Sequence, residues 1–178
     1  VAAGTLLAGN ASAFGSGGVA MVGGTLDLGS LAVGNPLTLT SGGLANAANF
    51  VGTQTVNGTF SYSAGTIGGT VNAVAGGVLK GSGVTFGGAV TIGDGATHAP
   101  GNSPGSQTFT NGLTYSGSST LQWELIGNTT TAPGTNYDTI SVTGGELSIG
   151  PSAIMQMIFN GAGSTVDWND TFWNTGHT

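Results

Sequence analysis

Charge is nearly absent from this chain of 178 residues. Only 4% of its residues are charged, where about 25% is usual in soluble domains, and Lys80 is the only Lys or Arg. With a formal net charge of −6, the chain has almost nothing with which to neutralise the phosphates of a nucleic acid or to bind an anionic membrane surface. We therefore expect no nucleic-acid partner.

Cysteine is absent too, which excludes a disulfide framework and thiolate chemistry. No apolar run reaches the roughly 18 residues that a membrane-spanning helix needs, so we expect no membrane insertion by this segment. The start of the chain, Val1 to Phe14, lacks the charged region that opens a signal peptide. We interpret the sequence as a mature or internal part of a longer protein.

Residues that build the exposed faces of helices are scarce as well. Thr, Ser, Asn and 36 Gly take the place of Glu, Lys and Arg, and these residues disfavour or interrupt helices. Hydrophobic residues nevertheless make up 38% of the chain, which is more apolar surface than disordered segments carry. The two observations together predict a folded, all-β chain.

Short runs of alternating apolar and polar residues take the place of helical patterns. A period of two puts successive side chains on opposite faces of a strand. The Gly-Gly, Asn-Gly and Ser-Gly pairs between the runs favour tight turns. The alternating apolar positions include Leu37 and Leu39, Val84 and Phe86, Val90 and Ile92, Leu121, Trp123 and Leu125, and Ile140 and Val142.

A degenerate repeat runs through the first half of the chain. Gly-Thr-Leu occurs at positions 4–6 and again at 24–26. Such a repeat is typical of β-solenoids, in which each coil stacks on the last, so that Thr, Ser, Asn and Val form ladders and stacked charges are avoided. We therefore predict a β-solenoid of about 8 or 9 coils, a rod on the order of 40 Å long.

A β-sandwich is the alternative fold for the C-terminal part, because residues 112–159 have the pattern of antiparallel strands with long loops. Composition also shifts near residue 98. Residues 1–98 are a Gly/Thr-rich repeat region with one Pro and no Trp, whereas residues 99–178 contain all three Trp and four of the five Pro. We expect the two β regions to be continuous parts of the same solenoid.

Three segments of the first region resemble a known bacterial repeat. They are residues 3–10 (Ala-Gly-Thr-Leu-Leu-Ala-Gly-Asn), 14–18 (Phe-Gly-Ser-Gly-Gly) and 23–28 (Gly-Gly-Thr-Leu-Asp-Leu). Together they resemble the autotransporter-associated β-strand repeat of large bacterial surface proteins.

The C-terminal region extends this resemblance. Residues 99–105 (Ala-Pro-Gly-Asn-Ser-Pro-Gly), 121–125 (Leu-Gln-Trp-Glu-Leu) and 136–142 (Asn-Tyr-Asp-Thr-Ile-Ser-Val) look like the end of such repeat regions. The resemblance implies a right-handed parallel β-helix passenger, exported across the inner membrane and displayed or released at the surface. The sequence has no translocator barrel with its amphipathic strands of about 10 residues, so the resemblance leaves the export route open.

Asp94, His98 and Ser103 have the residue types of a hydrolytic triad. No Gly-x-Ser-x-Gly elbow surrounds Ser103, however, and a Gly-rich loop orients a catalytic base poorly. We interpret residues 93–98 as a turn with Asx-type backbone hydrogen bonds. No catalytic residue, and no enzyme activity, is expected.

Metal and cofactor sites are not expected either. Asp27, Asp94 and Asp138 lie outside any tandem Gly-Gly-x-Gly-x-Asp run, and lone Asp residues rarely supply the six to eight oxygens of a calcium site. No glycine run completes a nucleotide-binding motif.

Asp167, Trp168, Asp170 and Trp173 form an acidic and aromatic cluster near the C-terminus. The tryptophans have the chemistry to stack on a sugar ring, and glycosidases use two carboxylates about 5 to 9.5 Å apart. The simpler interpretation is a terminal strand whose Trp side chains pack against a neighbouring coil or subunit. We take these four residues as contacts to a glycan or to a second subunit.

The sequence thus favours a non-enzymatic structural protein of the bacterial cell surface or extracellular space. Open strand edges with almost no Lys and few Pro to block them predict a homo-oligomer or polymer, such as a filament, stalk or passenger scaffold. The alternative is a glycan-binding or polysaccharide-cleaving β-helix that contacts surface glycans. That alternative requires exposed, coplanar Trp side chains in a groove.

Overall fold

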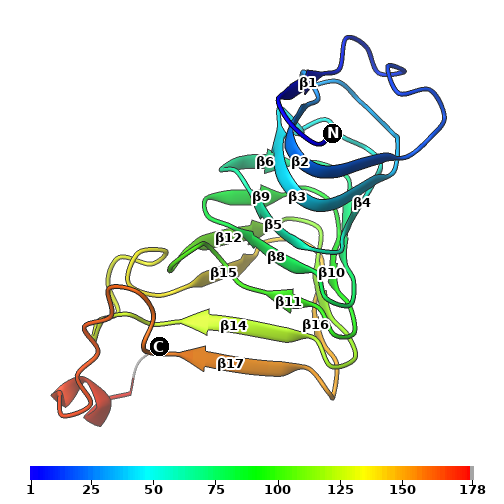
Figure 1. The fold of residues 1–178 in the computed structure, drawn as a ribbon. Coiled ribbons are helices and arrows are strands. Elements are labelled where there is room, and N and C mark those ends of the chain that lie inside the picture. The colour runs from blue at the N-terminus through cyan, green and yellow to red at the C-terminus, as the bar shows by residue number, and fades with distance from the viewer. Residues whose placement is uncertain (177–178) are drawn as a thin grey trace.

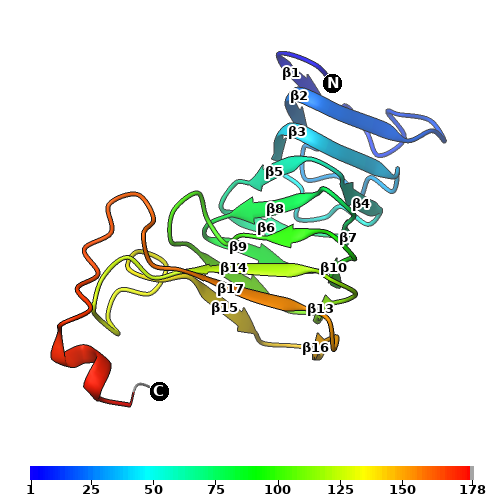
Figure 2. The same cartoon turned by 60° about the horizontal axis from the view of Figure 1, so that its bottom comes forward.

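The computed structural model describes residues 1–176, which form an elongated stack of short strands (Figure 1). Parallel sheets wind into a β-solenoid of about 6 turns, so the predicted all-β solenoid is confirmed. The N-terminus lies at one end of the stack, and the last strands lie at the other (Figures 1 and 2). His177 and Thr178, the last residues of the predicted region 99–178, lie outside the described residues.

Three parallel sheets form the sides of the solenoid. The eight-stranded sheet contains β1 (Thr5–Leu7), β2 (Val19–Asp27), β3 (Leu37–Ala45), β4 (Thr53–Val56), β7 (Thr70–Ala73), β10 (Val90–Ile92), β13 (Leu113–Tyr115) and β16 (Leu147–Ile149). The five-stranded sheet contains β5 (Thr59–Tyr62), β8 (Val78–Gly81), β11 (Thr97–His98), β14 (Thr120–Glu124) and β17 (Ile154–Ile158). The four-stranded sheet contains β6 (Gly65–Ile67), β9 (Val84–Phe86), β12 (Ser106–Phe109) and β15 (Thr139–Val142).

Like residues stack on like residues from one coil to the next. In the eight-stranded sheet the outward ladder reads Thr38, Thr55, Asn72, Thr91, Thr114 and Ser148. The inward ladder beside it reads Leu37, Gln54, Val71, Val90, Leu113 and Leu147. Because each side chain lies roughly 4.8 Å from its copy in the next coil, a repeated charge would face itself, which accounts for the scarcity of charge.

Aromatic side chains fill the core where the inward ladders meet. Tyr62, Phe86 and Phe109 come from three successive coils and are buried. The rings of Tyr62 and Phe86 meet edge to face at 5.2 Å, and those of Phe86 and Phe109 stack at 5.1 Å. Such ring pairs add stability beyond the area that they bury.

The first coils differ from the rest because β2 and β3 are long strands that bend. Their pairing register shifts between Met21 and Thr25, and Gly24 and Gly42 there have φ of 63° and 106°. A Cβ at Gly42 would lie 2.6 Å from the carbonyl oxygen of Gly24. Only glycine fits such a close crossing of backbones. Beyond the bend, β3 packs against β5.

The expected number of coils was wrong, because coil length is not constant. Thr53 lies opposite Thr70, but Leu113 lies opposite Leu147, so the later coil is twice as long as the earlier one. Most of the added length is the irregular segment 125–138 between β14 and β15. About 6 turns therefore replace the larger number that a constant coil length predicted.

The alternative β-sandwich for residues 112–159 was also wrong. The strands β13 to β17 continue the solenoid, since β15, β16 and β17 each pair in parallel with the preceding coil. The sheets also run without a break across residue 98, where β11 pairs with both β8 and β14.

Beyond β17 the chain leaves the stack as a tail that ends in the short 3-10 helix η1 (Thr171–Asn174). Asp170 caps this helix by accepting a hydrogen bond from the backbone N–H of Phe172 at 2.8 Å. Within residues 1–176, no helix has the length and apolar character that crossing a membrane requires.

Candidate functional site

Within residues 1–176, no further coil stacks on the last coil of the solenoid (Figure 2). Its inward positions are therefore open to solvent. Leu147 and Ile149 are 52% and 65% exposed, whereas Leu113 and Tyr115, directly opposite in the preceding coil, are 0% and 4% exposed. Leu147 and Ile149 thus occupy positions equivalent to core residues, but no further coil among the described residues covers them.

The other two sheets end in the same way. Met155 and Met157 of β17, which lie opposite Leu121 and Trp123, are about half exposed. With half-buried side chains of β15, they continue the apolar surface at this end. A hollow of about 480 Å³ in the surface is lined by Tyr115, Leu121, Trp123, Tyr137, Asp138, Thr139, Ile140, Val142, Leu147 and Ile149. We call the surface formed by the inward residues of β15, β16 and β17 the end face.

The N-terminal end is smaller and partly covered. Leu6 of β1 lies in the inward ladder of Leu26 and is 44% exposed. The loop between β1 and β2 folds over this end, where Phe14 packs against the core. Asn35 holds the loop by donating hydrogen bonds to the carbonyl oxygens of Gly15 and Gly17, at 3.0 and 2.7 Å.

The predicted contact residues lie in the tail beyond the end face. Trp168 is 62% exposed, and its ring stacks on that of Trp173 at 4.8 Å and 22°. Phe159 meets both indoles edge to face. The two tryptophans are thus brought together as a stacked pair.

The two predicted carboxylates act as local backbone acceptors. Asp167 accepts from the backbone N–H of Asn169 at 2.9 Å, and Asp170 accepts from that of Phe172 at 2.8 Å. Neither residue lines a described pocket. They hold the turn that presents Trp173, which also donates its indole N–H to the carbonyl oxygen of Asp167 at 2.9 Å.

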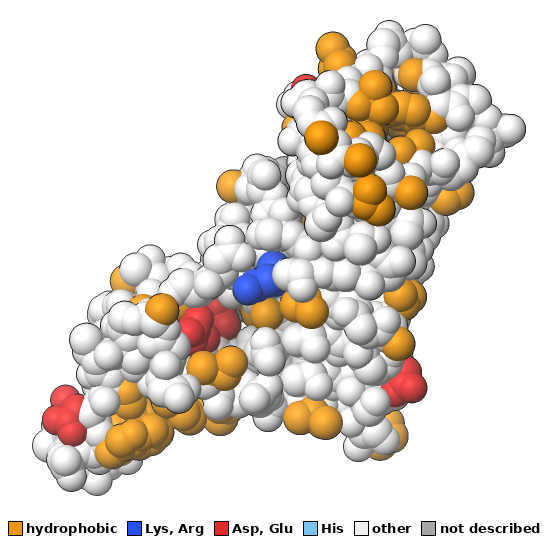
Figure 3. Space-filling view, in the orientation of Figure 1, with side chains coloured by type: hydrophobic (Ala, Val, Ile, Leu, Met, Phe, Trp, Pro, Cys, Tyr) orange, Lys and Arg blue, Asp and Glu red, His pale blue; other side chains and the backbone are white. Residues whose placement is uncertain are grey.

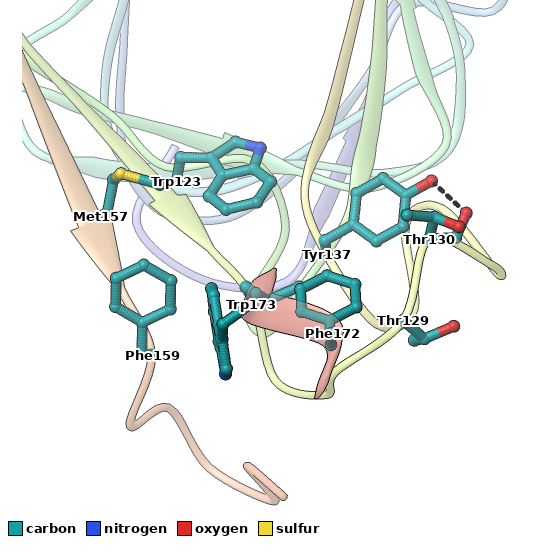
Figure 4. Close-up of a pocket in the computed structure, with 9 residues that line it drawn as sticks. Trp123, Thr129, Thr130, Tyr137, Met157, Phe159, Phe172 and Trp173 are labelled. Atoms are coloured by element: carbon teal, nitrogen blue, oxygen red, sulfur yellow. Dashed lines mark hydrogen bonds between the residues drawn. The ribbon is translucent and has the colours of Figure 1, made fainter. Parts of the chain in front are cut away.

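Between the tail and the last coils lies a pocket of about 410 Å³ that the sequence did not indicate (Figure 4). Its walls come from β14, β17, the segment 125–138 and η1. They consist of Trp123, Leu125, Thr129, Thr130, Tyr137, Met157, Phe159, Phe172 and Trp173. We call this the aromatic pocket. The only sequence feature that could have indicated this pocket is the enrichment of Trp and other aromatic residues after residue 108.

His98, Asp94 and Ser103 do not form a triad. His98 is fully buried in β11, where its Nδ1 lies 2.6 Å from the Tyr115 hydroxyl and its Nε2 lies 2.7 Å from the Gln107 side-chain oxygen. Asp94 instead accepts from the backbone N–H and the hydroxyl of Ser118. Asp94 lies in a turn, as interpreted, but its side chain bonds to the next coil rather than to its own turn, and His98 lies in β11 rather than in the turn. Burial lowers the pKa of His98 to about 4.

Asp138 is a buried carboxylate beside the Pro-Gly-Asn-Ser-Pro-Gly loop. Its two oxygens accept from the backbone N–H groups of Gly105 and Glu124, at 2.7 and 2.8 Å. Burial raises its pKa to about 6, although these hydrogen bonds and the charge of Lys80 oppose the rise. Asp138 thus ties the loop to the next coil.

Asp27, Asp94 and Asp138 belong to different coils. Asp27 accepts from the backbone N–H of Gly29 and from the side chain of Asn46, each at 2.8 Å. In the described part of the chain, no three His, Cys, Asp or Glu side chains group together as metal ligands.

Comparison with known proteins gives no match: no family model fits the sequence, and neither the curated proteins nor the solved structures include a similar one.

Proposed function

We propose that this chain is a non-enzymatic structural module, a rigid β-rod that self-associates at the bacterial cell surface or in the extracellular space. The observation that carries the proposal is the end face. Leu147 and Ile149 occupy inward positions that the preceding coil buries at Leu113 and Tyr115, yet they lie open to solvent.

The end face combines two features that favour another β-layer. Burying one Leu or Ile side chain contributes about 1.5 to 3 kcal/mol, and the end face offers several such side chains. The strands β15, β16 and β17 are each the last strand of their sheet, and an edge strand has unpaired backbone groups that accept a new strand. A second copy of the chain would bury the apolar side chains of the end face and pair with the open backbone groups of its edge strands.

The two ends of the rod are different, so a contact between opposite ends is heterologous. Such a contact produces an open filament when the rotation between copies does not close a ring. Leu6 and the free edge of β1 supply the apolar residue and the strand for the other end. A filament, stalk or passenger scaffold is therefore the proposed assembly.

The proposed location outside the cell is supported by the sequence. The lack of cysteine, the scarcity of charge and the resemblance of residues 3–10 and 99–105 to autotransporter-associated repeats all favour an exported passenger-like chain. The solenoid fold is compatible with such a passenger.

A charge placed on the end face tests the proposal. We expect the wild-type chain to form larger species as its concentration rises, visible as filaments by electron microscopy and as increasing mass by sedimentation velocity. In Ile149→Asp the carboxylate would have to be buried without a partner, which is costly, so this variant should remain a monomer across the same concentrations.

Ser148→Asp is the matched control, because Ser148 lies between Leu147 and Ile149 but belongs to the outward ladder. This variant should assemble like the wild type. A wild-type chain that remains monomeric at every concentration, or equal assembly by Ile149→Asp and Ser148→Asp, would contradict the proposal.

Glycan binding at the tail is the second candidate, and the exposure of Trp168 favours it. A ring face open to solvent can stack on a sugar. Against cleavage, the side chains of Asp167 and Asp170 are engaged with the backbone of their own turns. Titration with oligosaccharides while following Trp fluorescence tests this candidate, which requires a saturable change that is lost in Trp168→Ala.

A further inference from the structure

The aromatic pocket is formed by rings from four separate parts of the chain (Figure 4). Trp123 and Tyr137 form the wall on the solenoid side, with centroids 6.3 Å apart. Phe159 follows β17, and Phe172 and Trp173 belong to η1 in the tail, where the last two rings meet edge to face at 5.0 Å. Five ring systems thus surround one space of about 410 Å³.

The polar atoms of these rings already have partners. The indole N–H of Trp123 donates to the carbonyl oxygen of Asp138 at 2.8 Å, and that of Trp173 donates to Asp167 at 2.9 Å. The Tyr137 hydroxyl donates to the carbonyl oxygen of Thr130 at 3.0 Å. The aromatic walls therefore offer a ligand π-surface rather than hydrogen-bond donors, which suits neither an anion nor a ligand rich in hydroxyl groups.

The tail that carries two of the pocket's rings is acidic. Asp170 caps the helix that carries Phe172 and Trp173, and the backbone carbonyl of Asp167 accepts from the Trp173 indole, so two exposed acidic residues lie in the same tail as these rings. Figure 3 shows acidic side chains close to the hydrophobic surface at this end of the molecule. Lys80, the only Lys or Arg of the chain, does not line the pocket. The faces of aromatic rings are themselves electron-rich.

We propose that the aromatic pocket binds a small organic cation of the quaternary or methylated ammonium class. Such a cation is weakly hydrated, needs no hydrogen-bond acceptor and gains from several ring faces at once. The acidic residues near the tail wall add long-range attraction for a positive ligand. This site requires no second copy of the chain, although it shares Met157 with the end face.

The test compares choline with its uncharged isostere, 3,3-dimethylbutan-1-ol. The two have nearly the same shape and apolar surface, so they differ mainly in charge. Isothermal titration calorimetry of the full chain, supported by Trp fluorescence, should show saturable choline binding roughly tenfold or more tighter than that of the isostere, as expected for a desolvated cation near several rings.

Paired variants separate the ring faces from plain apolar contact. Trp173→Leu and Phe172→Leu keep an apolar side chain but remove a ring, and each should weaken choline binding roughly tenfold, whereas Trp173→Phe should retain most of it. Phe14→Leu makes the same kind of change at the opposite end of the rod and should bind choline like the wild type. Circular dichroism checks that every variant remains folded.

Three results would overturn this assignment. Equal affinities for choline and its isostere would make the pocket merely apolar. The absence of saturable choline binding to the folded wild type would remove the site. Binding of an oligosaccharide that is lost in Trp173→Leu and Phe172→Leu would assign the pocket to glycans instead. Each result is measured at a protein concentration at which the chain is a monomer, because a second copy on the end face would cover Met157 of the pocket.

Discussion

His98 lies in the centre of the solenoid with both ring nitrogens engaged. Because Gln107 presents its side-chain oxygen to Nε2, that nitrogen carries the proton, and Nδ1 accepts from the Tyr115 hydroxyl. Gln107 in turn donates to the carbonyl oxygen of Gly81 at 2.7 Å. In this chain of hydrogen bonds the His98 ring is neutral.

Replacing His98 should therefore change how stability depends on pH. The pKa of His98 is about 4 in the folded chain and about 6.5 when unfolded. The folded state thus resists protonation of His98. The stability that the folded chain has with a neutral His98 is fully present above pH 6.5 and is lost as the pH falls towards 4. The loss amounts to at most about 3 kcal/mol.

His98→Gln isolates this effect, because Asp138 titrates in both proteins. The raised pKa of Asp138 acts in the opposite direction, since its protonation below about pH 6 relieves a buried charge. At pH 7.5 we expect the variant to be roughly 1 to 3 kcal/mol less stable in urea unfolding, and the difference should shrink towards pH 4.5. A difference that is constant between these pH values would contradict the lowered pKa.

The position of His98 in the core could not be predicted from the sequence. Its partners lie 17 and 9 residues away, and neither spacing has a meaning until the coil length is known. For Asp94 the turn itself was predictable from the local sequence, but the hydrogen bonds of its side chain to Ser118, 24 residues away, were not. Local backbone structure was predictable at this scale, and contacts between coils were not.

The strands themselves were predictable as elements. Alternating runs such as Val84 and Phe86, or Val90 and Ile92, became β9 and β10 with both apolar residues buried. The direction of pairing was not predictable for the C-terminal part, because parallel and antiparallel strands share the same period of two. For that reason residues 112–159 also suited a sandwich.

The bend in β2 provides a test at the scale of elements. Gly24 has φ of 63°, and a Cβ there would lie 2.6 Å from the carbonyl oxygen of Gly4. Gly24→Ala should therefore lower the free energy of unfolding by about 1 kcal/mol or more, because alanine disfavours the left-handed backbone. A further loss of roughly 1 to 3 kcal/mol is expected because β1 must shift away from the new methyl group. Urea unfolding followed by circular dichroism measures both costs together.

Gly4→Ala separates the two costs. Gly4 has nearly the same φ, 68°, but a Cβ at this position would have open space around it, with no atom of another segment within 4 Å. This variant should lose only the backbone contribution. If the two substitutions prove equally costly, the close crossing of β1 and β2 does not contribute to stability.

At the scale of the whole molecule, ladders of uncharged residues and the rod-like fold could be inferred from composition. The coil count could not, since the segment 125–138 enlarges one coil without a repeat to show it. The same segment carries Tyr137, which faces the aromatic pocket together with Trp123 of β14. The sequence indicated the tail tryptophans as contact residues. Only the fold showed that Trp123 and Tyr137 of the solenoid lie opposite the tail.

The polar backbone edge of the last coil gives a prediction for the whole rod. The Gly150 N–H donates to Tyr115, and the Leu113 N–H donates to Glu146. Alternate residues of a parallel strand direct their N–H groups to opposite neighbouring strands. Because Glu146 and Gly150 bond to β13, the N–H groups of Leu147 and Ile149 point to the open edge.

Hydrogen exchange can follow these edge amides directly. In dilute solution the Ile149 amide should exchange quickly, whereas the Ile92 amide in the interior of the same sheet should be strongly protected. If a second copy adds a strand to the edge, protection at Ile149 should rise with protein concentration and Ile92 should not change. Exchange at Ile149 that is equally fast at all concentrations, in a sample that does assemble, would mean that the copies meet through another surface and not through the strand edge.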